Sequence, residues 1–178
     1  MAFILKLRRA AYVIVMGAIN FAMAILPWNN LRVFLVKLVG VRCGADVTLE
    51  RGLRLDFPWR LTIGRNCYIG KFVYLDCRGG KILIGDCTDI SEGAIIYTLT
   101  HDIQSENFSV KCGDVVVGDR NWICSRAIVL PRTVLGSGNV LGANSVFSGV
   151  SKNFSLLIGN PAKCVGQLNS KRASRVRL

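Results

Sequence analysis

The sequence predicts an all-β domain in which one chain coils through short extended runs, preceded by a hydrophobic helical segment. In residues 117–147 an aliphatic or aromatic side chain returns at every sixth position: Val117, Ile123, Val129, Leu135, Leu141 and Phe147. An amphipathic helix would repeat about every 3.6 residues and a half-buried strand about every second residue. A period of six therefore indicates that each short strand meets a corner before the next one begins, as in a β-helix.

Two companion patterns support the coil. The position after the repeat residue is glycine at Gly118, Gly136 and Gly142. The position four after the repeat residue is small throughout: Asn121, Ala127, Thr133, Asn139 and Ser145. We interpret the glycines as residues that give the corners backbone conformations closed to other side chains. The small residues would let one turn of the coil lie close to the next.

Composition and charge indicate one globular domain with basic ends. The chain has 178 residues, 51% of them hydrophobic, which is ample for a core. The net charge is +12, and residues 1–42 and 152–178 each carry six Lys or Arg and no acid, leaving 11 bases against 11 acids between them. This distribution argues against a nucleic-acid groove along the domain. It favours contact of the ends with phosphates or lipid headgroups, or a role in solubility alone.

The cysteines exclude two classes of site. There are seven, scattered along the chain without a CxxC pair, and they accompany a single histidine. This pattern fits neither a disulfide framework nor a zinc site, so we expect no metal and a reducing, cytosolic environment.

Residues 10–26 are nearly all apolar and follow a basic cluster at residues 6–9. As a helix this run would be about 25 Å long, slightly short of a bilayer core of about 30 Å, so a single span is marginal. The basic cluster and the small residues Ala22 and Ala24 also resemble a secretory signal. A third interpretation lays the segment in a membrane interface or against a partner subunit.

A second helix is predicted before the coil begins. Asn29 or Asn30 can cap its start and Gly40 can end it. One face collects Leu31, Phe34, Leu35 and Leu38. We therefore predict that residues 1–40 form a membrane-associated helical hairpin turned at Pro27.

The coil is predicted to span residues 41–168, followed by a basic tail at residues 169–178. Ahead of residue 117 the repeat positions are Val41, Val47, Leu53, Ile63, Ile69, Leu75, Ile84, Ile90 and Ile96. Four extra residues enter around residues 57–59, three around residues 79–80 and fifteen between residues 96 and 117. The longest insertion must leave the wall as a loop, and long loops in compact repeats usually carry function. It contains Thr100, His101 and Asp102.

Three segments resemble the hexapeptide-repeat acyltransferases. They are VVVGDRNWICSRAIVLPRTVLGSGNVLGANSV, the closing LIGNPAKCVG, and IIYTLTHDI, which is similar to the segment that carries the catalytic histidine of that family. Within the family the likeness is to the sugar O-acetyltransferases related to maltose and galactoside acetyltransferases, and it covers residues 41–168. It implies a left-handed parallel β-helix, a homotrimer with active sites between subunits, and acetyl-CoA as the co-substrate.

His101, the only histidine of the chain, lies inside this resemblance and is the predicted catalytic base. Acetyl transfer to a hydroxyl needs a base, and the pKa of an imidazole lies close to working pH. A base also needs a partner for its second ring nitrogen, and the candidates are Asp102, Asp89, Glu92 and a backbone carbonyl. The resemblance adds a backbone N–H near Ser125 as the oxyanion donor.

The resemblance also assigns the remaining contacts of the site. Coenzyme A would be held by Trp122, Ser125, Ala143, Ser148 and Lys163, with Lys163 meeting a phosphate. Trp122 also suits a plain wall position. The chain lacks the asparagine that relatives commonly place in the turn at residues 68–71. Asp76 and Asp102 are therefore the predicted acceptor contacts, and a structural role at a corner is the alternative for Asp76.

Four functions compete at this point. The first is acetylation of a sugar hydroxyl on a polysaccharide or lipid-linked glycan precursor at the cytoplasmic face of the membrane, which the apolar leader and the basic ends favour. The second is acylation of an amine on an amino sugar or amino acid. The third is a non-catalytic trimeric scaffold, which has no need of His101 or the long loop. The fourth, a secreted carbohydrate-binding coil, conflicts with the cysteines and with the need for acetyl-CoA.

Overall fold

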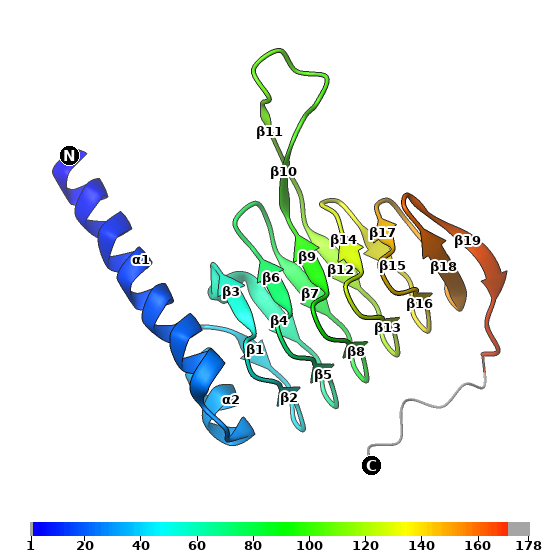
Figure 1. The fold of residues 1–178 in the computed structure, drawn as a ribbon, viewed down its shortest axis with the longest axis horizontal. Helices are drawn as coiled ribbons and strands as arrows, with labels where there is room; N and C mark the ends of the chain where they lie inside the picture. Colours follow the sequence, from blue (N-terminus) through cyan, green and yellow to red (C-terminus); the bar gives the residue numbers. More distant parts are fainter. Residues whose placement is uncertain (1, 171–178) are drawn as a thin grey trace.

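The structure is a computed structural model that describes residues 2–170. Two helices, α1 (Ala2–Ile25) and α2 (Asn29–Leu38), precede a parallel β-helix, in which the chain winds through three flat faces (Figure 1). Strands from successive turns of the coil pair in parallel on each face, so the predicted coil is confirmed. Of the predicted basic tail, residues 171–178 lie outside the described part of the chain.

Within residues 2–170, three sheets form the walls of the coil. Sheet A contains β1 (Arg42–Cys43), β4 (Leu61–Ile63), β7 (Ile82–Ile84), β12 (Val115–Val117) and β15 (Val134–Leu135). Sheet B contains β2 (Thr48–Leu49), β5 (Tyr68–Ile69), β8 (Asp89–Ile90), β13 (Trp122–Ile123), β16 (Val140–Leu141), β18 (Ser155–Gly159) and the antiparallel β19 (Ala162–Gln167). Sheet C contains β3 (Arg54–Asp56), β6 (Tyr74–Asp76), β9 (Ile95–Tyr97), β14 (Ile128–Val129) and β17 (Val146–Phe147).

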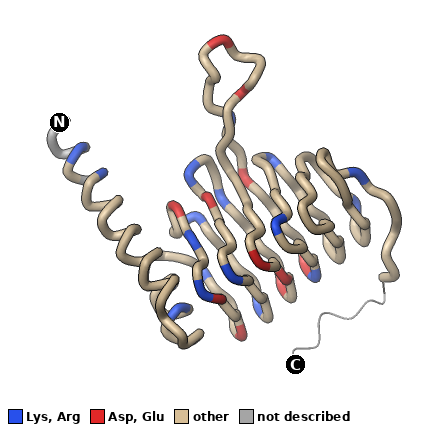
Figure 2. Tube along the Cα trace, in the orientation of Figure 1, with Lys and Arg blue, Asp and Glu red and all other residues tan. Residues whose placement is uncertain are grey.

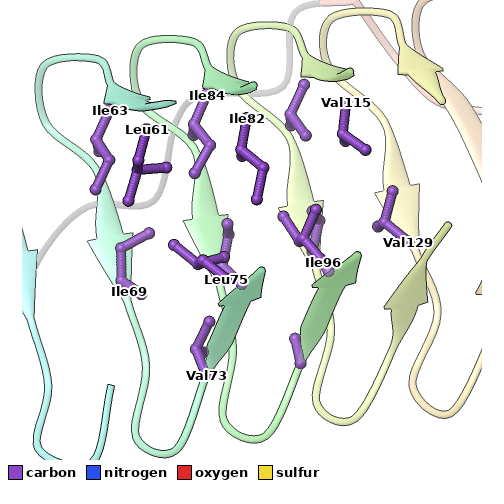
Figure 3. Close-up of a cluster of buried hydrophobic side chains, with 14 of the residues drawn as sticks. Leu61, Ile63, Ile69, Val73, Leu75, Ile82, Ile84, Ile96, Val115 and Val129 are labelled. Carbon is purple, nitrogen blue, oxygen red and sulfur yellow. The ribbon is translucent and has the colours of Figure 1, made fainter. Parts of the chain in front are cut away.

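The repeat positions form the core. Every one of them from Val117 to Phe147 is buried; Ile123 and Val129 are 0% exposed and Phe147 is 6% exposed. Figure 3 shows such side chains pointing into the coil in layers that come from successive turns. Because burial of an aliphatic side chain stabilises a fold by about 1.5–3 kcal/mol, the repeat positions contribute substantially to the stability of the coil.

The corners differ from the prediction in one respect. Gly118 does not adopt a left-handed conformation, which falls two residues later, on Arg120 with a φ of 56°. Glycine is needed at position 118 for a different reason, because a Cβ there would lie 2.8 Å from Ser137 Oγ in the next turn. The small residues do allow close stacking: buried Asn121 accepts the N–H of Asn139 at 2.9 Å through its Oδ1, which ties two turns together.

All three insertions leave the coil at the same corner, between sheet C and sheet A. The first contains a short 3₁₀ helix (Pro58–Arg60), the second occupies residues 77–81, and the third contains a β-hairpin. The irregular parts of the chain therefore gather along one edge of an otherwise regular coil (Figure 1).

The two helices cover the first turn of the coil. No earlier turn pairs with it, so its backbone N–H and C=O groups need other partners. The Asn20 side chain donates to the carbonyl of Leu55 (3.1 Å) and accepts from its N–H (3.0 Å). The Asn29 side chain accepts from the N–H of Leu49 (2.8 Å) and donates to the carbonyl of Val47 (3.1 Å). These amides take the place of the missing strand.

The predicted helix cap at Asn29 or Asn30 is wrong. The N-cap residue is Trp28, whose side chain makes no capping hydrogen bond, because the amide of Asn29 is engaged with the coil. The predicted end of the helix at Gly40 is confirmed, since Gly40 has a φ of 95° directly after the C-cap residue. Among residues 2–170, no helix is both long and apolar enough to cross a membrane.

Candidate active site

The long insertion folds as an antiparallel hairpin of β10 (Leu99–His101) and β11 (Val110–Cys112), which stands out from the coil (Figure 1). Its tip is held by hydrogen bonds: Asp102 N–H donates to the Ser109 carbonyl at 2.8 Å, and Ser109 N–H donates to Ser105 Oγ at 3.2 Å. Lys111 Nζ lies 3.6 Å from the carboxylate of Asp102. His101 is the last residue of β10, so this hairpin decides where the imidazole points.

The imidazole of His101 is exposed and fixed through one nitrogen. Its Nδ1 lies 2.7 Å from the carbonyl oxygen of Phe108. A carbonyl can only accept, so Nδ1 carries the proton, and in the neutral ring the lone pair is on Nε2. Phe108 reaches this position with a left-handed φ of 46°. Of the candidates left open by the sequence, the backbone carbonyl is the partner.

The two predicted acceptor residues have different surroundings. The Asp102 carboxylate accepts the N–H of Gln104 at 3.0 Å, and this hydrogen bond, followed by the charge of Lys111, lowers its pKa. The Asp76 side chain is 0% exposed, and both of its oxygens accept from Arg78, at 2.9 and 2.8 Å. The exposed member of that pair is Arg78, whose pKa is raised by the hydrogen bonds to Asp76.

Thr98, which sequence reasoning missed, anchors the base of the hairpin. It is 0% exposed, and its hydroxyl donates to the Asp76 carbonyl at 2.6 Å and accepts the N–H of Gly79 at 3.0 Å. Its carbonyl accepts the N–H of Gly113 at 3.0 Å, where the chain returns to the coil. Thr98 thereby ties the hairpin to the preceding turn.

Sequence reasoning also missed an aromatic and charged cluster on the outer face of sheet C, beside the hairpin. The Tyr74 hydroxyl donates to Asp56 Oδ2 at 2.6 Å, and burial together with this hydrogen bond raises the pKa of Tyr74. The ring of Tyr97 meets that of Tyr74 edge to face at 5.8 Å, and Arg54 lies 4.8 Å above the Tyr74 ring. The sequence did contain a signal for this cluster. Tyr74 and Tyr97 stand next to the buried repeat positions Leu75 and Ile96, so their side chains must point to the outer face of the sheet.

The five residues expected to hold coenzyme A are all exposed. Ser125 and Ala143 lie in adjacent turns at the corner between sheets B and C, where Asn144 N–H donates to the Ser125 carbonyl at 3.1 Å. On sheet B, the Trp122 indole donates to Ser91 Oγ at 2.9 Å. The other two lie apart from this corner, Ser148 after β17 and Lys163 on β19.

The predicted residues therefore do not form one group. The hairpin with His101 leaves the coil at the corner between sheets C and A, whereas Ser125 and Ala143 lie at the corner between sheets B and C. No single corner within residues 2–170 carries all of the predicted residues. Within residues 2–170, no three His, Cys, Asp or Glu side chains are placed to hold a metal ion.

The known proteins that are similar to this chain include acetyltransferases. The chain is 33% identical over 132 residues to a protein of Escherichia coli K12 named "Putative colanic acid biosynthesis acetyltransferase WcaF", covering 74% of this chain and 71% of that protein. No protein-family model matches the chain.

Solved structures share the fold. The hexapeptide-repeat acetyltransferase VCA0836 of Vibrio cholerae superposes with a TM-score of 0.82 at 21% identity, covering 90% of this chain and 93% of that one. A galactoside acetyltransferase in complex with coenzyme A superposes with a TM-score of 0.79 at 17% identity, covering 91% and 83%.

Proposed function

Because the chain belongs to the hexapeptide-repeat acetyltransferases, we propose that it transfers the acetyl group of acetyl-CoA to a sugar hydroxyl, with His101 as the general base. The observation that carries the proposal is the 2.7 Å contact between His101 Nδ1 and the Phe108 carbonyl. In the neutral ring this contact places the lone pair on Nε2 of an exposed imidazole, which is the atom that a general base uses.

The reaction follows from that tautomer. His101 Nε2 takes the proton of the acceptor hydroxyl as its oxygen attacks the thioester carbonyl carbon. The C–S bond then breaks, and the coenzyme A thiolate leaves with the proton that the imidazolium returns. A backbone N–H near Ser125 is the proposed donor to the oxyanion.

We assign the donor groove to Trp122, Ser125, Ala143, Ser148 and Lys163. Their exposure supports this assignment, because a ligand can reach all five. Ser125 and Ala143 offer backbone groups in adjacent turns, which suits an extended pantetheine arm. Lys163 provides a charge for a phosphate.

The separation of His101 from the Ser125 corner supports a homotrimer in which neighbouring chains complete each site. Sheet A presents an apolar row across its turns, in which Val116 lies in register between Leu83 and Val134. Val150 continues the row through a parallel bridge to Val134, and Leu83, Val134 and Val150 are 37%, 40% and 78% exposed. Such a row is a suitable surface for another copy of the chain.

For the acceptor we propose a sugar of a polysaccharide or of a lipid-linked glycan precursor, handled at the cytoplasmic face of the membrane. The name of WcaF, which links that protein to colanic acid biosynthesis, supports this class. The proposed contacts are Asp102 beside His101, the exposed Arg78 guanidinium that Asp76 holds in place, and the Tyr74–Tyr97 cluster. Charged groups suit sugar hydroxyls, and aromatic rings suit sugar faces.

Thiol release from acetyl-CoA tests the proposed function when it is measured against sugars, nucleotide sugars, lipid-linked glycans and amines. We expect release only with a hydroxyl acceptor, and labelled acetate in the product should be removable by hydroxylamine, which cleaves esters and spares amides. A hydroxylamine-stable product would establish the amine alternative. Absence of release with every acceptor would favour the non-catalytic scaffold.

A further inference from the structure

The outer side of α1 and α2 is lined by exposed apolar side chains, which we call the cap face: Ile14, Phe21, Ile25, Trp28, Phe34 and Leu38. Their exposed fractions lie between 56% and 71%. The three residues on α1 are spaced seven and four apart, so they share one stripe of the helix. An exposed apolar surface of this kind marks a contact with a partner.

The opposite side of α1 is attached to the coil. The Tyr12 hydroxyl accepts the N–H of Phe57 at 3.1 Å, and Asn20 pairs with the backbone of Leu55. Met16 and Met23 are buried, at 5% and 0% exposed. A surface helix ordinarily turns its apolar stripe inward and its polar groups outward. Here the polar groups hold the helix to the coil, so the cap face stays outside.

Exposed bases flank the cap face. Lys6 and Arg9 lie near the start of α1 and Lys37 lies in the last turn of α2. Residues 1–45 contain no Asp or Glu, and Figure 2 shows only basic residues coloured on the two helices. Apolar and aromatic side chains edged by bases suit an anionic lipid surface, where apolar groups enter the acyl boundary and bases meet phosphates. A second copy docked through this face would bring like charges together.

We propose that the cap face is a membrane-docking surface for bilayers that contain anionic phospholipids. The helices lie in the plane of the interface, with Trp28, at the junction of α1 and α2, at the level of the headgroups. The inference adds a partner to the proposed function. It is independent of the acetyl-transfer chemistry, because no cap-face residue belongs to the predicted site.

Vesicle sedimentation with the full-length chain tests the proposal. The probes are vesicles of phosphatidylcholine alone and of an equimolar mixture of phosphatidylcholine and phosphatidylglycerol. We expect roughly tenfold stronger binding to the mixed vesicles, and a loss of at least roughly tenfold in Phe34→Glu. The matched control is Val165→Glu, because Val165 and Phe34 are both 59% exposed and Val165 lies at the other end of the coil. This control should bind like the wild type.

A second variant does not touch the apolar stripe. Lys6→Gln/Arg9→Gln should lower affinity for the mixed vesicles by roughly fivefold per charge and leave binding to neutral vesicles unchanged. Failure of the wild type to bind mixed vesicles, or equal loss in Val165→Glu, would overturn the proposal. So would a lipid-free oligomer that Phe34→Glu breaks into smaller species, because the face would then join copies of the chain. Thiol release with a water-soluble acceptor should persist in Phe34→Glu, whereas failure of the wild type in that assay would count against the proposed function instead.

Discussion

At the scale of single residues, His101 depends on a backbone group rather than on a carboxylate. The Phe108 carbonyl fixes the ring and its tautomer, while Asp102 is occupied by Gln104 and Lys111. The orientation of the imidazole is therefore set by the hairpin turn, and we expect it to survive substitution of nearby acids.

Replacing His101 by Ala should reduce turnover roughly 100- to 10,000-fold, the usual contribution of a general base. Coenzyme A affinity should change little, because the proposed donor groove lies on another part of the coil. Steady-state kinetics measures the turnover, and calorimetry measures the affinity for coenzyme A. Near-normal turnover in this variant would remove His101 from the mechanism.

Cys77 makes stability sensitive to alkaline pH. Burial, and then the charge of Asp76, raises the pKa of its thiol from 9.0 to about 12. Between those values the unfolded chain releases a proton that the folded chain keeps, so the free energy of unfolding falls as pH rises above about 9, by up to about 1.4 kcal/mol per pH unit. Below that pH both states hold the proton and the contribution is constant.

Urea unfolding at about pH 8 and about pH 10 measures this dependence. Cys77→Ala should lose less stability between the two pH values than the wild type, whereas Cys164→Ala, which removes an exposed thiol, should match the wild type. If the free energy of unfolding depends on pH equally in all three proteins, the raised pKa of Cys77 is not the cause of that dependence.

At the scale of elements, the helices act as the missing first turn of the coil. Asn29→Ala should cost about 1–3 kcal/mol of unfolding free energy, because the Leu49 N–H then loses its partner. Asn30→Ala, one residue further and exposed, should stay within about 0.5 kcal/mol of the wild type. Thermal or urea unfolding compares the two. Equal losses would mean that the Asn29 amide does not stabilise the edge of the coil.

The strands were predictable from sequence, and the corners were not. A period of six dictates which residues point inward, so burial of Ile123 and Leu141 follows from spacing alone. The left-handed corner falls on Arg120, a residue with no preference for that conformation, because closure of the coil imposes it.

Partners far along the chain escaped prediction for a similar reason. The Asn29 amide suits a helix cap equally well, and only the fold brings Leu49, 20 residues away, to it. The partner of His101 is a carbonyl, which every residue carries, so sequence gives no sign of it. His101 could be chosen as the candidate base from the sequence, while the orientation of its ring required the structure.

At the scale of the whole molecule, the proposed trimer makes assembly a requirement for a complete site. The wild type should sediment as a particle of three 19.5 kDa chains. Val134→Glu places a charge in the apolar row of sheet A, so it should dissociate to monomers and lose turnover. Val165→Glu should remain trimeric. A fully active monomer of either protein would show that one chain suffices.

The helix layer also fixes how far the chemistry stands from a bilayer. If the helices rest on lipid, the coil points away from the surface, and the hairpin follows the third strand of sheet C. With neighbouring strands about 4.8 Å apart and a helix about 10 Å across, the imidazole is held roughly 20 Å above the headgroups. A hydroxyl next to a lipid phosphate would lie too close to the membrane to reach the imidazole. A hydroxyl several sugars along a lipid-linked glycan would reach it. The N-terminal helices would then work as a spacer that selects acceptors by reach.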